Sequence, residues 1–143
     1  MIRKATYKDA PFIRILMEAL GYKTSLGLLI TQLEKLAGRT DMDVFVLELD
    51  NAVVGFISVH YLPQLGFDGE LVQITYLSAD ETIAKPEVAK ELEVYMAEQA
   101  RKRKCDRIQV HCHDWRVSTH GFYIKQGYTE YPKYFTKRLI YGE

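Results

Sequence analysis

The order in which the hydrophobic spacing changes along the chain constrains its fold more than any other feature of the sequence. Residues 2–5 predict a short strand, and two helices are expected after it. Thr6 and Asp9 have the spacing of a capping box, which opens the first helix. Ser25 is a suitable cap for the second. Left-handed glycines end helices, and the candidates here are Gly21 and Gly38.

After the second helix the spacing changes to that of strands. Val44–Leu49 and Val53–Val59 are apolar and β-branched, and Asp50-Asn51 between them predicts a hairpin turn. Leu71–Leu77 continues as a further strand. Pro86 then suits the first turn of a long helix, where its missing N–H is not needed.

The last third of the chain returns to short elements. We expect a strand at Ile108–Cys112, a helix at about 118–126 that Gly127 ends, and one or more strands within Tyr128–Ile140. A strand, helix and strand in succession near 71–112 imply a parallel crossover, whereas the early hairpin implies antiparallel pairing. The prediction is an α/β (α+β) fold with a mixed, mostly antiparallel central sheet and helices on both faces.

Composition excludes several classes of protein. The 143 residues suit one domain, 1–143. Lys plus Arg equals Asp plus Glu at 19 each, which argues against a dedicated nucleic-acid binder. No apolar run approaches the roughly 18 residues of a membrane span, so no membrane is expected. The 2 cysteines are too few for a disulfide scaffold, and no signal peptide is evident, so a cytoplasmic location is predicted.

Several short stretches occur in the order seen in one known family: Ile2–Thr6 with Asp9, Val44–Val46 with Val54–Ile57, Arg116 to Tyr128, and Tyr134–Lys137. The third contains Thr119-His120 and Phe122-Tyr123, and Gly127-Tyr128 closes it. Together they resemble the GNAT superfamily of N-acetyltransferases over nearly the whole chain. The resemblance implies acetyl-coenzyme A as cosubstrate and the amine of a small molecule or protein as acceptor.

The resemblance also implies site residues. A splayed strand, Thr75–Ala79, would hold the pantetheine arm, with backbone N–H groups at Leu77, Ser78 and Ala79 polarising the carbonyl. Arg116, which begins the third of these stretches, is implied to bind the cofactor as well. Tyr123 would protonate the departing thiolate, because a positioned phenol can supply that proton. The alternative is that Tyr123 has no catalytic role and packs in the core as part of the Phe122-Tyr123 pair.

The phosphate cradle at the start of the long helix departs from the family pattern, Arg-Gly-x-Gly-x-Gly/Ala. The matching positions are Ala84, Lys85, Pro86, Glu87, Val88 and Ala89. Of these only Ala89 fits, and Glu87 adds a negative charge where a pyrophosphate would sit. The loss of the Arg together with this charge is expected to cost several kcal/mol, or roughly a hundred- to thousand-fold in affinity. Lys85 would recover part of this affinity as a point charge on phosphate. An ordinary helix start that binds no ligand explains the segment equally well.

The attacking amine must lose a proton, and a carboxylate or a water chain can take it. Glu70 is the first candidate for this general base and Asp68 the second, although a solvated loop around Gly66 and Gly69 explains either residue. His60 and Tyr61 end their strand and are candidates to line the acceptor cleft, or else form a half-exposed strand end.

A metal site is not expected. His111, Cys112, His113 and Asp114 are adjacent, but alternate residues of a strand face opposite sides, so the four cannot converge on one ion. Nucleophile-elbow and P-loop motifs are absent from the sequence.

Two functions remain open on the sequence alone. The first is an acetyltransferase working by direct attack of the amine. The second is a non-catalytic GNAT-fold binding module that has lost acetyl-coenzyme A binding, because its cradle is substituted. The loops at 21–27 and 62–69 are expected to set acceptor specificity. The resemblance also implies a homodimer, with Tyr131, Tyr134 and Tyr141 as interface candidates.

Overall fold

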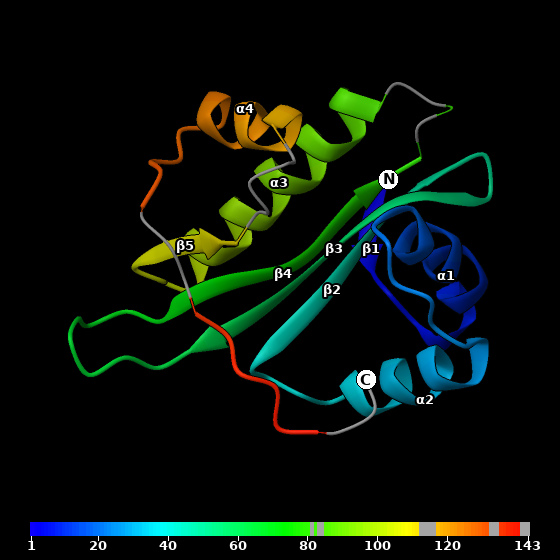
Figure 1. The fold of residues 1–143 in the computed structure, drawn as a ribbon, viewed down its shortest axis with the longest axis horizontal. Coiled ribbons are helices and arrows are strands. Elements are labelled where there is room, and N and C mark those ends of the chain that lie inside the picture. Colours follow the sequence, from blue (N-terminus) through cyan, green and yellow to red (C-terminus); the bar gives the residue numbers. More distant parts are fainter. Residues whose placement is uncertain (81, 83–84, 112–116, 132–134, 141–143) are drawn as a thin grey trace. The chain divides into compact units, whose positions relative to one another are not determined.

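The computed structural model describes residues 1–80, 82, 85–111, 117–131 and 135–140 (Figure 1). The chain divides into two compact units, Met1–Val110 and His111–Glu143, which are described separately. The larger unit holds the sheet. Its elements are β1 (Ile2–Lys4), the 3-10 turn η1 (Tyr7–Asp9), α1 (Ala10–Ala19), α2 (Leu26–Leu36), β2 (Met42–Leu49), β3 (Ala52–Leu62), β4 (Leu71–Ala79), α3 (Lys85–Lys102) and β5 (Arg107–Val110). The smaller unit contains α4 (Val117–Lys125).

The sheet has five strands in the order β1-β2-β3-β4-β5. The pairs β1–β2, β2–β3 and β3–β4 are antiparallel, and β4–β5 is parallel. The parallel pair is joined through α3, which is the crossover that the sequence predicts. The predicted fold class, a mixed and mostly antiparallel sheet with helices, is confirmed.

Local signals in the sequence end and begin the helices as expected. Thr6 and Asp9 form the capping box, in which the Thr6 N–H donates to Asp9 Oδ2 at 2.8 Å, but the box begins the 3-10 turn η1 that leads into α1 rather than α1 itself. The hydroxyl of Ser25 accepts from the Leu28 N–H at 3.1 Å at the start of α2. Gly21 has a φ of +97° just after α1, a left-handed conformation that glycine adopts without steric cost.

Helices cover both faces of the sheet (Figure 1). On one face, α1 and α2 bury Ile13, Leu16 and Leu33 against Val46 and Phe56. On the other, α3 places Val88, Leu92 and Met96 in the core; the strand residues Phe45, Leu47, Ile57, Val59 and Val72 are also buried. Alternate strand residues face opposite sides, so each strand contributes to both cores.

Gly55 is the point where α3 comes closest to the sheet. A Cβ at this position would lie 2.6 Å from Val88 Cγ1 and 3.1 Å from Leu92 Cδ1. The close packing of α3 on β3 therefore depends on a residue without a side chain.

The later elements differ from the sequence prediction in three ways. The strand expected at Ile108–Cys112 is β5, Arg107–Val110, and Cys112 lies outside the described residues. The helix starts at Val117 and ends at Lys125, about one residue earlier than expected. The strand expected within Tyr128–Ile140 is absent from described residues 128–131 and 135–140. Strand propensity in this segment is high, but a strand also needs a pairing partner, which propensity cannot supply. In the described chain, no helix is long and apolar enough to cross a membrane.

Candidate active site

Strand β4 is paired on both sides at its start and on one side at its end. It pairs with β5 only from Leu71 to Ile74, whereas it pairs with β3 as far as Ala79. The two strands part at Thr75, which is also the extra residue of a β-bulge opposite Ser58. The Thr75 hydroxyl bonds the backbone oxygen of Ser58 at 3.0 Å and its hydroxyl at 2.9 Å, which fixes the bulge.

The parting of β4 and β5 leaves an open backbone edge. The Asp80 N–H donates to the Val54 oxygen at 2.7 Å, so Asp80 bonds toward β3. Because bonding direction alternates along an antiparallel strand, Ser78 also bonds toward β3, while Leu77 and Ala79 direct their N–H and C=O groups away from it. Among the described residues no strand pairs with β4 on that side beyond Ile74. Of Leu77, Ser78 and Ala79, the three residues named within the strand predicted to hold the pantetheine arm, two therefore face an open edge.

Ser78, the third of these residues, faces inward instead. Its side chain is buried and donates to the Leu16 backbone oxygen at 2.9 Å. This bond ties the last turns of α1 to β4, which makes Ser78 a residue that positions the strand rather than one that reaches the open edge.

A tight turn leads from β4 toward α3. The Asp80 carboxylate accepts from the Thr82 hydroxyl at 2.7 Å and from the Thr82 N–H at 2.9 Å, and these bonds hold the pKa of Asp80 below its usual range. The helix begins at Lys85, with Pro86 in its first turn as predicted. The first N–H groups of an α-helix have no partner within the helix, so they are available to a ligand. Ala84 lies outside the described residues.

The side chains of Glu87 and Val88 differ from the expectation for a phosphate cradle. Glu87 lines a groove of about 570 Å³ with Ile2 of β1 and with further residues of α3: Lys90, Glu91, Val94, Tyr95 and Glu98. β1 is at the opposite edge of the sheet from β5, so Glu87 points away from the open edge of β4. Val88 is buried against Gly55. The electrostatic cost that Glu87 adds to binding a pyrophosphate is accordingly smaller than its position in the sequence suggests.

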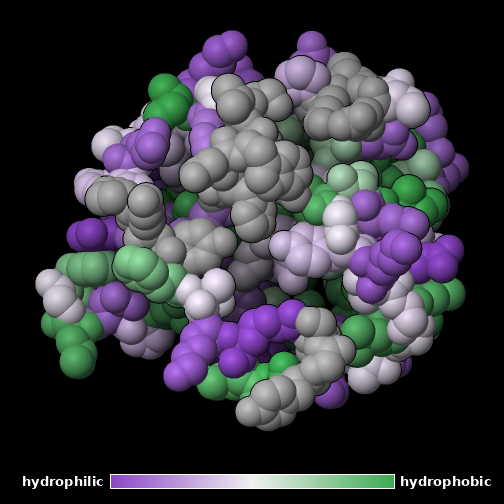
Figure 2. All heavy atoms as spheres, in the orientation of Figure 1, coloured by the Kyte–Doolittle hydropathy of each residue, from purple (hydrophilic) through white to green (hydrophobic). Residues whose placement is uncertain are grey.

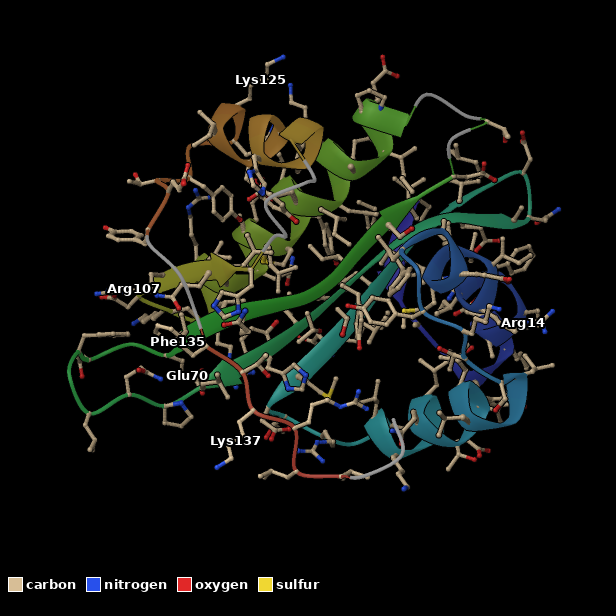
Figure 3. All side chains as sticks on the ribbon, in the orientation of Figure 1. Arg14, Glu70, Arg107, Lys125, Phe135 and Lys137 are labelled. Atoms are coloured by element: carbon tan, nitrogen blue, oxygen red, sulfur yellow. The ribbon has the colours of Figure 1, made fainter. Side chains whose placement is uncertain are left out.

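Glu70, labelled in Figure 3, comes just before β4 and forms an ion pair with Arg103. Arg103 Nε donates to Glu70 Oε1 at 2.7 Å, and this hydrogen bond lowers the pKa of Glu70. Glu70 precedes Leu77 by seven residues, or about 23 Å of extended strand. The structure therefore does not bring these predicted site residues together, and the pairing with Arg103 favours a structural role for the carboxylate.

His60 and Tyr61 lie on opposite faces of β3, because they are neighbours in a strand. Tyr61 is buried under Arg103, whose guanidinium is 3.9 Å from the ring centre, and its hydroxyl donates to Asp43 at 2.7 Å. Burial first, and then Asp43, raises the pKa of Tyr61. Tyr61 is thus a core residue, and of the two only His60 is on the α1–α2 face.

The smaller unit contains the predicted acid. Tyr123 is buried on α4, and its ring makes edge contacts with Phe122 and Tyr128, each with 5.2 Å between ring centres. His120 is on the same helix, and its Nε2 is a buried atom without a hydrogen-bond partner in the described residues. Arg116 lies outside the described residues.

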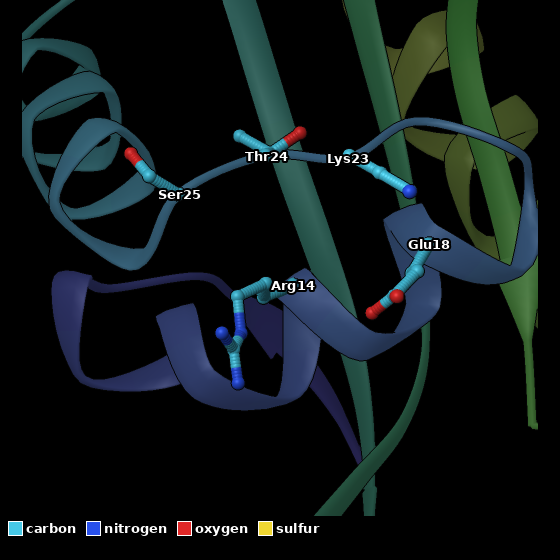
Figure 4. A pocket seen from close by; sticks show the side chains of 5 residues that line it. All are labelled: Arg14, Glu18, Lys23, Thr24 and Ser25. Atoms are coloured by element: carbon cyan, nitrogen blue, oxygen red, sulfur yellow. The ribbon is translucent and has the colours of Figure 1, made fainter.

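A hollow of about 300 Å³ lies where α1 meets the loop to α2 (Figure 4). The residues that line it are Arg14, Glu18, Lys23, Thr24 and Ser25. The sequence predicts that loop 21–27 sets acceptor specificity, but it does not predict that Arg14 and Glu18 of α1 line the same hollow. Their spacing of four residues on the polar face of α1 is the signal that could have found them.

The second predicted specificity loop, 62–69, joins β3 to β4. Leu62 and Leu65 are exposed on it, and this part of the molecule carries apolar side chains on its surface (Figure 2, lower left). Phe67 stacks under the Arg107 guanidinium at 3.9 Å. This contact ties the loop to β5.

No group of three or more His, Cys, Asp or Glu side chains gathers at ligand distance within the described residues. Cys112, His113 and Asp114 of the sequence cluster are outside them. Cys105 is a free thiol, and burial raises its pKa.

The chain matches the acetyltransferase (GNAT) family over residues 12–128. It belongs to the GNAT acetyltransferase family. No curated protein matches the chain significantly.

Solved structures share the fold of this family member at low sequence identity. A GNAT family acetyltransferase of Staphylococcus aureus is 19% identical, with a TM-score of 0.82 over 97% of this chain and 98% of its own. An aminoglycoside acetyltransferase from an uncultured soil metagenomic sample, in complex with sisomicin, is 21% identical. Its TM-score is 0.81 over 98% of this chain and 96% of its own. A Bacillus halodurans protein described as a transcriptional regulator is 16% identical. Its TM-score is 0.87 over 97% of this chain and 99% of its own.

Proposed function

We propose that this GNAT protein transfers the acetyl group of acetyl-coenzyme A to a primary amine by direct attack. The observation that carries the proposal is the open edge of β4 just before α3, where the backbone groups of Leu77 and Ala79 pair with no strand among the described residues. Acetyl-coenzyme A supplies an acetyl thioester, whose carbonyl carbon accepts an amine nitrogen.

The residues present fit the arm of this cosubstrate. The pantetheine arm contains amide groups, and an open strand edge offers N–H donors and C=O acceptors at the spacing of a β-ladder. Leu77 and Ala79 would hold it in this way. Such backbone binding does not depend on side-chain identity, so the substituted cradle leaves it intact.

The residues present fit the diphosphate end of acetyl-coenzyme A less fully than they fit its arm. The helix start at Lys85 and Glu87 offers N–H groups and the positive end of the α3 dipole. The Arg of the family pattern is Ala84 here, and Pro86 has no N–H to donate. We therefore expect the arm to contribute a larger share of the binding than the phosphates do. Ala84, Lys85, Ala89 and Arg116 stay predictions as cofactor-binding residues.

Tyr123 is proposed to protonate the thiolate that leaves. The acceptor is a small-molecule or protein amine, and sisomicin enters an amine screen only because a protein of the same fold binds it. The homodimer, the cytoplasmic location and the absence of nucleic-acid or membrane partners stay predictions.

The first test is calorimetric titration with acetyl-coenzyme A. A dissociation constant in the micromolar range is expected. No heat up to millimolar ligand would overturn the proposal and favour the non-catalytic binding module instead.

The second test is Tyr123→Phe, assayed with an amine from the screen. Loss of the phenol proton should lower turnover about 10²- to 10⁴-fold, because that is the usual contribution of a general acid. The dissociation constant for acetyl-coenzyme A should change much less. Unchanged turnover would remove Tyr123 from the mechanism.

A further inference from the structure

A row of side chains crosses four strands on the α1–α2 face of the sheet. Met42 of β2 pairs with His60 of β3, His60 with Gln73 of β4, and Gln73 with Gln109 of β5. Residues directly opposite each other in a sheet project to the same face. His60 is the member of this row that carries an imidazole.

The apolar core under α1 and α2 includes side chains of the row next to this one. Residues of α1 and α2 pack on the neighbouring row, which includes Val44 and Tyr76, and Tyr22 makes an edge contact with the Tyr76 ring at 5.4 Å between centres. His60 and Gln73 are half-buried and Gln109 is exposed. Within the described chain the ring nitrogens of His60 make no hydrogen bond, so the imidazole is available to a ligand.

The row lies beside the place where β4 and β5 part. Gln73 precedes Ile74, the last β4 residue paired with β5, and Thr75 is the bulged residue beyond it. His60 and Thr75 are diagonal neighbours, which in a sheet are about 7–8 Å apart and within reach of long side chains. His60 is therefore near the inner end of the open edge, on the face away from α3.

Other ionisable groups near this end of the sheet are already engaged. Asp41, which faces His60 from the start of β2, is bound by Arg39 at 2.7 Å. On the α3 face, Asp43 accepts from Tyr61 and Glu70 from Arg103. On the same face as His60, Tyr76 lies in the row on one side, where it pairs with Ser58, and Arg107 lies in the row on the other, where it pairs with Leu71. In the described part of Met1–Val110, His60 is thus the imidazole beside the parting point, and imidazole is the side chain that most often serves as a general base in enzymes.

We infer that the arm runs back along β4 from the start of α3, so that the acetyl group lies where β4 and β5 part rather than at residues 77–79. There His60 faces it from the α1–α2 side and acts as the general base that deprotonates the attacking amine. The inference rests on the proposed function. The imidazole takes one proton from the primary ammonium ion, and the neutral amine forms a C–N bond as the C–S bond of the thioester breaks. The thiolate leaves and takes up, in net balance, the second proton that the acylated nitrogen loses, and the imidazolium returns its own proton to solvent, so the step needs no further reactant.

The test uses bromoacetyl-coenzyme A, which carries an electrophilic carbon in place of the acetyl methyl group. An imidazole held against this carbon forms a C–N bond and displaces bromide. Peptide mass mapping of the full-length protein should find the added group on His60. Coenzyme A in excess should protect it, and His60→Gln should abolish the modification at this site. His111→Gln, which removes another imidazole, is the matched control and should leave His60 labelled.

Calorimetry with acetyl-coenzyme A accompanies the labelling. His60→Gln should bind acetyl-coenzyme A within about threefold of the unsubstituted protein, because backbone groups hold the arm. If acetyl-coenzyme A binds but coenzyme A-protected labelling falls on another residue, or none occurs, the inference is overturned while the proposed function stands. Binding that is lost in His60→Gln alone would show a structural role and also overturn it. If the unsubstituted protein does not bind acetyl-coenzyme A, both the proposed function and the inference about His60 fail.

Discussion

At the scale of single residues, Gly55 shows how one missing side chain sets the packing of a helix. Gly55→Ala should destabilise the protein by about 1–3 kcal/mol, because the added Cβ would overlap Val88 Cγ1 at 2.6 Å and press on Leu92. Thermal unfolding should show a midpoint lowered by roughly 4–10 °C.

Gly66→Ala is the matched control for this substitution. A Cβ at Gly66 meets nothing within 4 Å, so the unfolding midpoint should hardly move. Adding Val88→Ala to Gly55→Ala should recover part of the loss, since it removes the clashing methyl group. Equal midpoints for Gly55→Ala and Gly66→Ala would contradict the close packing of α3 described above.

At the scale of elements, the pair Arg3–Asp9 joins β1 to the start of α1. The guanidinium of Arg3 donates to both oxygens of the nearly buried Asp9 at 2.9 Å. Burial by itself raises the pKa of Asp9, but the hydrogen bonds from Arg3 and Thr6 and the charge of Arg3 lower it below its usual range. Since the folded pKa is the lower one, this contribution to stability is present above the unfolded pKa of about 3.9 and is lost as pH falls through the folded pKa.

Asp9→Asn should therefore be less stable at pH 7 by about 1–3 kcal/mol, the usual worth of charge-assisted hydrogen bonds. Its loss of stability between pH 7 and pH 3, measured by urea unfolding, should be smaller than that of the unsubstituted protein. Asp41→Asn, which removes an exposed ion pair with Arg39, is the comparison and should change this pH dependence less. An undiminished acid loss in Asp9→Asn would rule out the pair as its source.

At the scale of the whole molecule, ligand binding should appear as thermal stabilisation. A ligand at a hundred times its dissociation constant adds about 2.7 kcal/mol, which corresponds to roughly 8–10 °C in the unfolding midpoint of a domain of this size. We expect this shift with coenzyme A, which has both the arm and the phosphates.

The matched ligand is 3′-phospho-ADP, which has the phosphates but no arm. At the same concentration it should shift the midpoint much less, because Leu77 and Ala79 hold the arm while Ala84 and Pro86 weaken the cradle. A shift as large as that of coenzyme A would place the binding energy in the phosphates and contradict the role assigned to the β4 edge.

Much of the fold follows from the sequence by itself, because the interactions that end and begin its elements are local. The capping box of Thr6 and Asp9, the Ser25 cap and the left-handed Gly21 each involve residues within a few positions of one another. Element order and strand spacing then lead to a mixed sheet. The opposite faces of His60 and Tyr61 also follow from strand alternation alone.

What only the tertiary structure decided concerns residues far apart in the chain. Ser78 bonds Leu16 across 62 positions, and Glu70 pairs with Arg103 across 33. The bulge at Thr75 depends on the register of β3 against β4. The direction of Glu87 depends on how α3 sits on the sheet, which Gly55 permits. Local propensity carries no information on register or helix packing, because both arise from contacts formed only when distant segments meet.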